Sequence, residues 1–373
     1  MDIGPRIKLA RARAGLTLRE LAERVGVSAT AISKFERGEV APRQSTLLHL
    51  AEALSVGIDY FFRDIRIRAV APAYRKHSRL SARAREAVKA TTVEAVERLL
   101  TVEQLFPSGF LTVPKLPRYT VHAVEDAERA ADKLRTAWHL GSDPIEDLCG
   151  RLEGRGIKVV ALDGPQGFDG YSCWVNSDIP VIAFNADVPG DRQRFDLCHE
   201  LGHLVLKVAD SVDAEKAAHR FAGAFLVPAE AARVELGPKR TKLSLDELLL
   251  LKRQYGVSIQ VWIRRAFDLG IIDRNTYDAL FRRLSAQGWR TQEPDGVPPE
   301  HPRRLRLLTH QALAENLITP SFAATLLDES PRTRPQSAEL SEPSPDLERE
   351  YLENEELRAF VDADVEDFHD EDC

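Results

Sequence analysis

Apolar residues recur along the 373-residue chain at two spacings, which separate expected helices from expected strands. One helix is predicted within residues 215–228, because its apolar residues stand at i, i+3, i+4 and i+7: Ala218, Phe221, Ala222 and Phe225. Short runs rich in β-branched and aromatic residues predict strands at 158–162, 171–175 and 181–184, with a turn at 176–178. Helices around a small antiparallel sheet therefore predict an α+β domain in the middle of the chain.

The N-terminal region predicts a set of short helices. Each is expected to begin at an N-cap hydroxyl, Thr17, Ser28 or Ser45, and to end near a glycine at position 15, 26 or 38. The tight junction at 25–27 is typical of the turn in a helix-turn-helix. A third helix at 28–37 would then enter the major groove of double-stranded DNA. Its expected DNA-contacting residues are Ser28, Ala29, Thr30, Ser33, Lys34 and Arg37. The alternative is a small helical bundle used only for dimerisation.

Composition divides the chain into five segments. The stretch 79–106 has helical spacing with many arginines, and prolines break the chain on its C-terminal side. The predicted segments are a DNA-binding domain at 1–66, a basic helical connector at 67–118, an α+β domain at 119–290, a helical segment at 291–329 and an acidic disordered tail at 330–373. Further helices are predicted at 126–140, 145–154, 244–255, 258–268, 274–286, 303–316 and 320–327.

Charge is distributed unevenly along these segments. Residues 1–90 hold 18 lysines and arginines against 9 acidic residues, whereas residues 339–373 hold 2 arginines against 15 acidic residues. The net charge of −7 therefore hides a basic head and an acidic tail. The basic head suits contacts with DNA phosphates, and the tail could compete with DNA for it or simply promote solubility.

The strongest chemical signal is the run from His199 to His203, which reads His-Glu-Leu-Gly-His within a predicted helix at 194–206. Histidines four residues apart lie on one helix face, so both imidazoles can reach one zinc ion. Glu200 would point toward water bound to that metal and could act as the base of a peptidase.

A third ligand is expected twelve residues after the second histidine, at Glu215. This carboxylate is predicted to lie on the inward face of its helix, where burial needs a partner such as zinc. Two histidines and one glutamate leave a coordination position open, as catalytic zinc sites do. The alternatives are that Glu215 pairs with Lys216 or Arg220, or that Asp210 or Asp213 is the ligand. His219 is expected to support the site or pack in the core.

Residues 170–228 resemble the ImmA/IrrE-type metallopeptidases in five stretches. These are Gly170-Tyr-Ser-Cys-Trp174, Pro180-Val-Ile-Ala-Phe-Asn185, Arg192-Gln-Arg-Phe195, the His-Glu-Leu-Gly-His helix and the run from Glu215 to Pro228. The resemblance implies a zincin-like domain in which His199, His203 and Glu215 bind zinc and Glu200 is the base. It also implies cleavage of helix-turn-helix repressors in stress or mobile-element control. The family usually has Asn or Asp where this chain has His219.

The first 65 or so residues resemble the Xre or lambda-repressor-like DNA-binding domains. Residues 248–327 also look like the helical C-terminal part of Xre-linked peptidases of this kind. Ala29 is a departure, since many relatives carry a longer polar residue there. The combined expectation is a multidomain protein with an all-α helix-turn-helix head, a zincin-like α+β domain with a helical C-terminal part, and an acidic disordered tail.

Two classes of function fit these features. The first is a DNA-binding zinc metalloendopeptidase, with Mn²⁺ as an alternative metal, which cuts a repressor-like protein. The second is a transcription regulator whose peptidase-like domain senses a ligand or metal and cuts nothing, or a toxin–antitoxin component. The intact motif with Glu215 favours the enzyme. Cutting of its own connector between 79 and 117 is not expected, because a folded helix is a poor substrate for a site that holds extended peptides.

The expected location is the cytoplasm, and a homodimer is the expected assembly. The chain has no apolar run of 18 residues and begins without a recognisable signal peptide, so no membrane association is expected. Its four cysteines show no C-x-x-C pairing and are expected to be reduced thiols.

Overall fold

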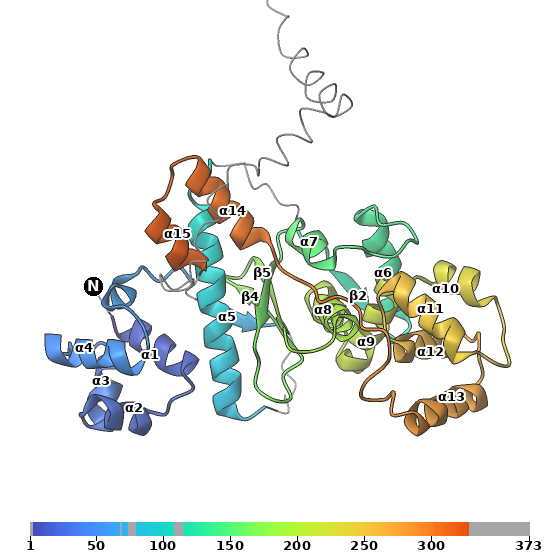
Figure 1. The fold of residues 1–373 in the computed structure, drawn as a ribbon, viewed down its shortest axis with the longest axis horizontal. Helices are drawn as coiled ribbons and strands as arrows, with labels where there is room; N and C mark the ends of the chain where they lie inside the picture. Colours follow the sequence, from blue (N-terminus) through green and yellow to red (C-terminus); the bar gives the residue numbers. More distant parts are fainter. Residues whose placement is uncertain (1–2, 68, 74–79, 108–114, 328–373) are drawn as a thin grey trace, which may run out of the picture. The chain divides into compact units, whose positions relative to one another are not determined.

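The computed structural model describes residues 3–67, 69–73, 80–107 and 115–327 (Figure 1). The acidic tail expected from residue 330 lies outside the described residues. The chain divides into two compact units, Met1–Leu317 and Ile318–Cys373. In the second unit the structure describes one helix, α15 (Pro320–Leu327). All other elements belong to the first unit.

The N-terminal region is helical, as the sequence predicts. Its elements are α1 (Gly4–Arg13), α2 (Leu18–Val25), α3 (Ala29–Glu36), α4 (Gln44–Ala53) and the 3-10 helix η1 (Ile58–Phe62). Thr17 caps α2 in a reciprocal capping box with Glu20, and Gly26 ends it at φ 75°. Ser28 caps α3 by accepting a hydrogen bond from the Ala31 amide.

The predicted N-cap at Ser45 is wrong. The N-cap of α4 is Arg43, whose backbone is extended and whose side chain makes no capping hydrogen bond. The first turn therefore starts at Gln44, and Ser45 already lies inside it. Sequence reasoning chose the better capping residue, whereas the backbone path after Pro42 starts the helix earlier.

The central domain is built on a four-stranded sheet in the order β1-β4-β5-β3. Its strands are β1 (Val70–Pro72), β3 (Lys158–Leu162), β4 (Gly170–Val175) and β5 (Ile179–Asn185). β4 is antiparallel to both β1 and β5, but β3 and β5 run parallel. The expected antiparallel sheet is therefore wrong, because β5 inserts between β4 and β3 and gives a mixed sheet. A second, parallel pair joins β2 (Tyr119–Val121) to β6 (Leu206–Val208).

Helices cover both faces of the four-stranded sheet (Figure 1). Along β5, Ile182 and Phe184 pack into the core formed with α8 (Gly190–Val205), whereas Val181 and Ala183 pack with α5 (Ala82–Glu103). This alternation follows from the two-residue period of a strand. Both faces are buried, so β5 is apolar from Ile179 to Phe184 and polar only at Asn185.

The remaining helices extend the domain, and the last of them packs against α5. They are α6 (Asp126–Ala137), α7 (Leu148–Glu153), α9 (Ala214–Leu226), α10 (Ala229–Leu236), α11 (Leu245–Tyr255), α12 (Ile259–Asp268), α13 (Arg274–Ala286) and α14 (Arg304–Ala314). The sequence patterns predicted most of these helices but missed α10 and the short strands β1, β2 and β6.

The segment expected to be a connector is a structural part of the first unit. Helix α5 presents Glu97, which binds Arg6 of α1 at 2.5 Å and accepts hydrogen bonds from the Arg66 and Ile67 amides. Near its C-terminal end, Glu103 pairs with Lys158 of β3 at 2.6 Å. The same helix therefore contacts the helix-turn-helix region and the sheet.

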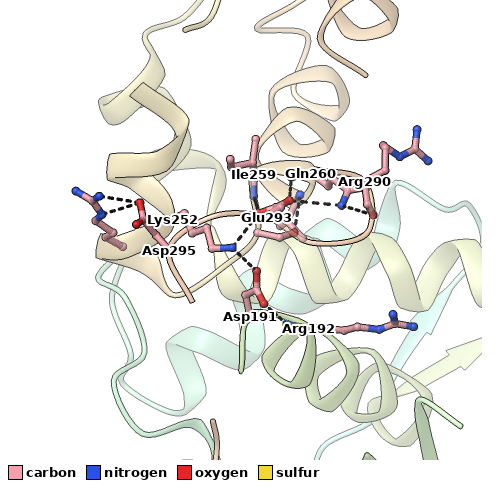
Figure 2. A network of polar contacts seen from close by, with 11 residues as sticks. Asp191, Arg192, Lys252, Ile259, Gln260, Arg290, Glu293 and Asp295 are labelled. Atoms are coloured by element: carbon pink, nitrogen blue, oxygen red, sulfur yellow. Dashed lines mark hydrogen bonds and ion pairs between the residues drawn. The ribbon is translucent and has the colours of Figure 1, made fainter. Parts of the chain in front are cut away.

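A buried ionic network fixes the residues after α13 against α8, α11 and α12 (Figure 2). The Lys252 ammonium of α11 lies 2.8 Å from Asp191 and 3.0 Å from Glu293. Glu293 also accepts hydrogen bonds from the Ile259 and Gln260 amides at the start of α12. The Lys252 side chain is 2 % exposed, so its charge is almost fully removed from water.

We expect the change Lys252→Met to destabilise the protein by about 3–5 kcal/mol, because it leaves two buried carboxylates without a cation. The matched control is Arg253→Ala on the next residue. Arg253 pairs with Asp295 at the surface with its side chain 60 % exposed, so its loss should cost about 1 kcal/mol or less. Urea denaturation measures both, and equal losses would contradict the central role of Lys252.

Candidate metal centre

Helices α8 and α9 bring together three side chains that could bind a metal ion. His199 and His203 lie one turn apart on α8, and Glu215 lies in the first turn of α9. Within the part of the chain that the structure describes, these residues form the one group of metal-binding character. The geometry therefore joins the three predicted ligands.

The distances among the three ligand atoms suit a tetrahedral ion. The Nε2 atoms of His199 and His203 are 3.0 Å apart, and they lie 3.5 and 3.6 Å from the Glu215 carboxylate. Ligands about 2.0–2.1 Å from a tetrahedral zinc ion are about 3.3 Å from one another. Two imidazoles and one carboxylate at these separations fit zinc.

Two residues in the predicted alternatives for Glu215, Asp213 and Arg220, have other partners in this geometry. Asp213 caps α9 by accepting hydrogen bonds from the Glu215 and Lys216 amides. Arg220 instead binds Glu128 at 2.6 Å. The cap at Asp213 thus fixes the backbone that places Glu215 toward the two histidines.

A glycine sets the close approach of the two helices. A Cβ at Gly202 would lie 3.2 Å from the Phe221 ring and 3.3 Å from the Ala218 Cα. Because α9 packs directly on this backbone, the ligands of the two helices can meet at one point. The sequence marked Gly202 only as part of the motif.

Glu200 lies beside the sheet and not among the three ligands. Its carboxylate accepts a 2.5 Å hydrogen bond from the Ser172 hydroxyl of β4, and Gly170 leaves room for its side chain. Burial raises the pKa of Glu200, although the nearby His199 and the Ser172 hydrogen bond oppose this shift. Sequence reasoning missed Ser172, whose signal lay in the stretch from Gly170 to Trp174.

Burial and nearby charged groups shift the pKa values of His199 and His219 in opposite directions. Burial opposes protonation of His199, but the carboxylates of Glu215, Glu200 and Asp196 outweigh it and raise its pKa. Burial and then His199 lower the pKa of His219 to about 4. The His219 ring packs on His199 with centroids 4.6 Å apart, which agrees with its expected supporting role.

The expected DNA-contacting residues lie on α3 and at its two caps, Ser28 and Arg37. Ser28, Thr30, Lys34 and Arg37 are exposed, and Ala29 and Ser33 are partly exposed. Ile32 and Phe35 instead point into the core of the helical region. The polar face of α3 is therefore accessible to solvent, although Arg37 also pairs with Glu39 at 3.1 Å.

Comparisons with known proteins match these two regions. Residues 7–61 match the helix-turn-helix family, and residues 152–267 match the IrrE N-terminal-like domain of the M78 peptidases. An uncharacterized transcriptional regulator in the ATPase CF(0) region of Rhodospirillum rubrum is 43 % identical over 63 residues, which are 17 % of this chain and 58 % of the relative. The HTH-type transcriptional regulator ImmR of Bacillus subtilis (strain 168) is 38 % identical over 60 residues, 16 % of this chain and 47 % of the relative.

The chain combines an Xre-type helix-turn-helix domain, which implies DNA binding, with an IrrE-like M78 peptidase domain that carries a His-His-Glu group. It spans about half the length of the curated relatives it matches. Among the helices that the structure describes, none is both long enough and apolar enough for a bilayer span.

We expect the change Gly202→Leu to force α8 and α9 apart, since its side chain would meet α9. Overpacking of this kind typically costs about 1–3 kcal/mol. The matched control is Gly296→Leu, because nothing lies within 4 Å of a Cβ at Gly296. Urea unfolding and the zinc content of each variant, with zinc supplied, are the measurements. A Gly202→Leu protein with unchanged stability and metal content would contradict the role of this contact.

Proposed function

We propose that the protein is a DNA-binding zinc metalloendopeptidase that cleaves a repressor-like regulatory protein. The observation that carries the proposal is the convergence of His199, His203 and Glu215. Glu200 lies on α8, the helix that carries both histidines. Three protein ligands with a coordination position left open are the pattern of a catalytic zinc site. The match to the M78 peptidases supports the same reaction class.

In this mechanism His199, His203 and Glu215 hold the ion. Zinc, or Mn²⁺ in its place, would supply a Lewis acid that polarises the peptide carbonyl and acidifies water. Glu200 accepts a proton from the attacking water and returns it to the amine nitrogen of the leaving chain. Burial shifts the pKa of Glu200 upward, in the direction of neutral pH, which suits a general base. The hydrogen bond from Ser172 orients the Glu200 carboxylate.

For the DNA-binding domain we propose that Ser28, Ala29, Thr30, Ser33, Lys34 and Arg37 line the DNA interface. The exposure of the polar side of α3 supports this assignment. A homodimer would place two such helices in successive turns of the major groove. The proposed protein substrate is a helix-turn-helix repressor, by the resemblance of residues 170–228 to ImmA/IrrE-type peptidases.

A second candidate is a regulator that senses a ligand or metal and cuts nothing. It is supported by the two relatives described above, which carry regulator names. A toxin–antitoxin role fits the domain pairing, but no residue singles it out. For either function we propose a cytoplasmic location, which the three free cysteines buried in the described structure support.

The change Glu200→Gln separates the two candidates. It should keep the metal and the fold but lower the rate of peptide hydrolysis by about 10²–10⁴-fold, because it removes the proton acceptor. The assay mixes zinc- or manganese-loaded protein with repressors encoded beside its gene and detects fragments by mass spectrometry. His203→Ala is the companion variant, and it should lose both metal and activity.

An exposed histidine elsewhere, changed by His122→Ala, provides the control for metal content. If no fragment forms with the wild-type protein while DNA binding changes with metal, the second candidate, a regulator that senses metal and cuts nothing, is correct. Equal zinc content in wild type and His203→Ala would instead overturn the ligand assignment.

The DNA interface predicts a variant with weakened binding. Changing Ser33→Ala and Lys34→Ala together should reduce affinity for the chain's own promoter DNA about tenfold and make binding less dependent on salt. Lys133→Ala, which removes an exposed lysine from α6, should leave both unchanged. Fluorescence anisotropy over a series of salt concentrations measures these effects. Equal losses in both proteins would show that α3 is not the DNA-contacting element.

A further inference from the structure

Strand β1 lies along the edge of the strand that positions Glu200. In β4, Ser172 holds the Glu200 carboxylate, and Gly170 lies against the Glu200 side chain. β1 pairs with β4 in antiparallel register, with Val70 opposite Val175 and Pro72 opposite Cys173. Residues from the segment between the DNA-binding domain and α5 therefore run along β4 toward the proposed base.

This pairing uses the backbone groups that an extended substrate would need. The Ala73 amide donates to the Ser172 carbonyl at 3.0 Å, and the Asn176 amide donates to the Ala69 carbonyl at 3.0 Å. An extended peptide commonly binds by adding a strand to a sheet edge through such main-chain hydrogen bonds. While β1 is in place, these groups of β4 are engaged.

While β1 is paired with β4, the free edge on this side of the sheet is the outer edge of β1. This edge is poorly suited to bind an extended peptide. Hydrogen-bonded pairs alternate along an antiparallel ladder, and Ala73 with Ser172 and Ala69 with Asn176 are such pairs. By this alternation Ala71 faces β4 with its backbone groups, while the nitrogen of Pro72 faces outward. Proline has no amide hydrogen, so it weakens any further strand addition at this edge.

Contacts on both sides hold β1 against β4. Val70 packs on the cluster that includes Val88 of α5, and Ala73 packs on the core that includes Leu201 of α8. Just before the strand, Arg6 binds the carbonyls of Arg63 and Asp64. The strand is thus a packed part of the sheet and is anchored to the DNA-binding domain.

We propose that residues 69–73 are an inhibitory strand, which occupies the substrate-binding edge of β4 and must leave it before a protein substrate can bind. This inference rests on the proposed peptidase function. The occupant that replaces the strand is an extended segment of the substrate, paired antiparallel to β4. The strand therefore makes access to the active site depend on the segment that follows the DNA-binding domain.

The test uses full-length, zinc-loaded protein carrying Glu200→Gln, so that bound peptide is not cut. The probe is a fluorescent peptide with the sequence of residues 66–73, Arg-Ile-Arg-Ala-Val-Ala-Pro-Ala. Adding Ala71→Pro removes an amide that faces β4 and should release the strand, so the peptide should bind at least about tenfold tighter, as expected for loss of main-chain pairing. Ala71→Ser is the matched control, because it changes the same exposed residue but keeps the amide that faces β4, and it should not increase binding.

A second variant tests the strand in the opposite direction. Pro72→Cys places a thiol opposite Cys173 in a non-hydrogen-bonded pair, whose Cα separation of about 4.5 Å suits a disulfide. Oxidation should lock β1 in place and abolish peptide binding, and reduction should reverse the effect. Circular dichroism checks that each variant is folded, so the locked form keeps the inference testable if Ala71→Pro does not fold.

Activity is measured separately, with β-casein as an unfolded substrate and Glu200 intact. Faster cleavage by Ala71→Pro and slower cleavage by oxidised Pro72→Cys would support the inhibitory strand. If no variant cleaves but peptide binding changes as expected, the peptidase proposal fails and the occupied edge stands. Equal peptide binding by all variants would overturn the inference, and so would wild-type protein that cuts itself beside β1, since the strand would then be a substrate.

Discussion

The close approach of α8 and α9 at Gly202 is the constraint on which the metal centre depends. His199 and His203 come from one helix, but the third ligand, Glu215, comes from the next, and a larger residue at 202 would separate them. The position of α9 is fixed further along by Glu128 of α6, which binds Arg220 and Arg265. The ligand geometry is thus a consequence of helix packing as much as of the motif.

Buried charges hold the other end of α8. Lys252 joins Asp191 to Glu293, and Arg194 binds Glu300 at 2.5 Å with both side chains almost fully buried. A desolvated ion pair adds little net stability, but loss of either partner leaves a buried charge that is costly. Residues after 290, predicted as a separate helical segment, therefore help to fix the helix that carries both histidines.

Helix α5 and strand β1 connect the helix-turn-helix region with the sheet beside the candidate metal centre. Arg6 and Glu97 bind the end of the helix-turn-helix region to α5, and the chain then enters β1 beside the strand that orients Glu200. The contacts of Glu97 with Arg6 and with the Arg66 and Ile67 amides thus lie a few residues before the strand that pairs with β4. In this arrangement part of the segment predicted as a linker belongs to the four-stranded sheet.

The sequence by itself determined the local features of the protein. Helix caps at Thr17 and Ser28, the spacing of His199 and His203, and the period of the apolar residues depend on neighbours within a few positions. Only the tertiary structure decided that β3 and β5 pair in parallel, that Ser172 holds Glu200, and that β1 covers β4. These contacts join residues far apart in the chain, and no local spacing encodes which distant backbone edge or buried charge a residue will meet.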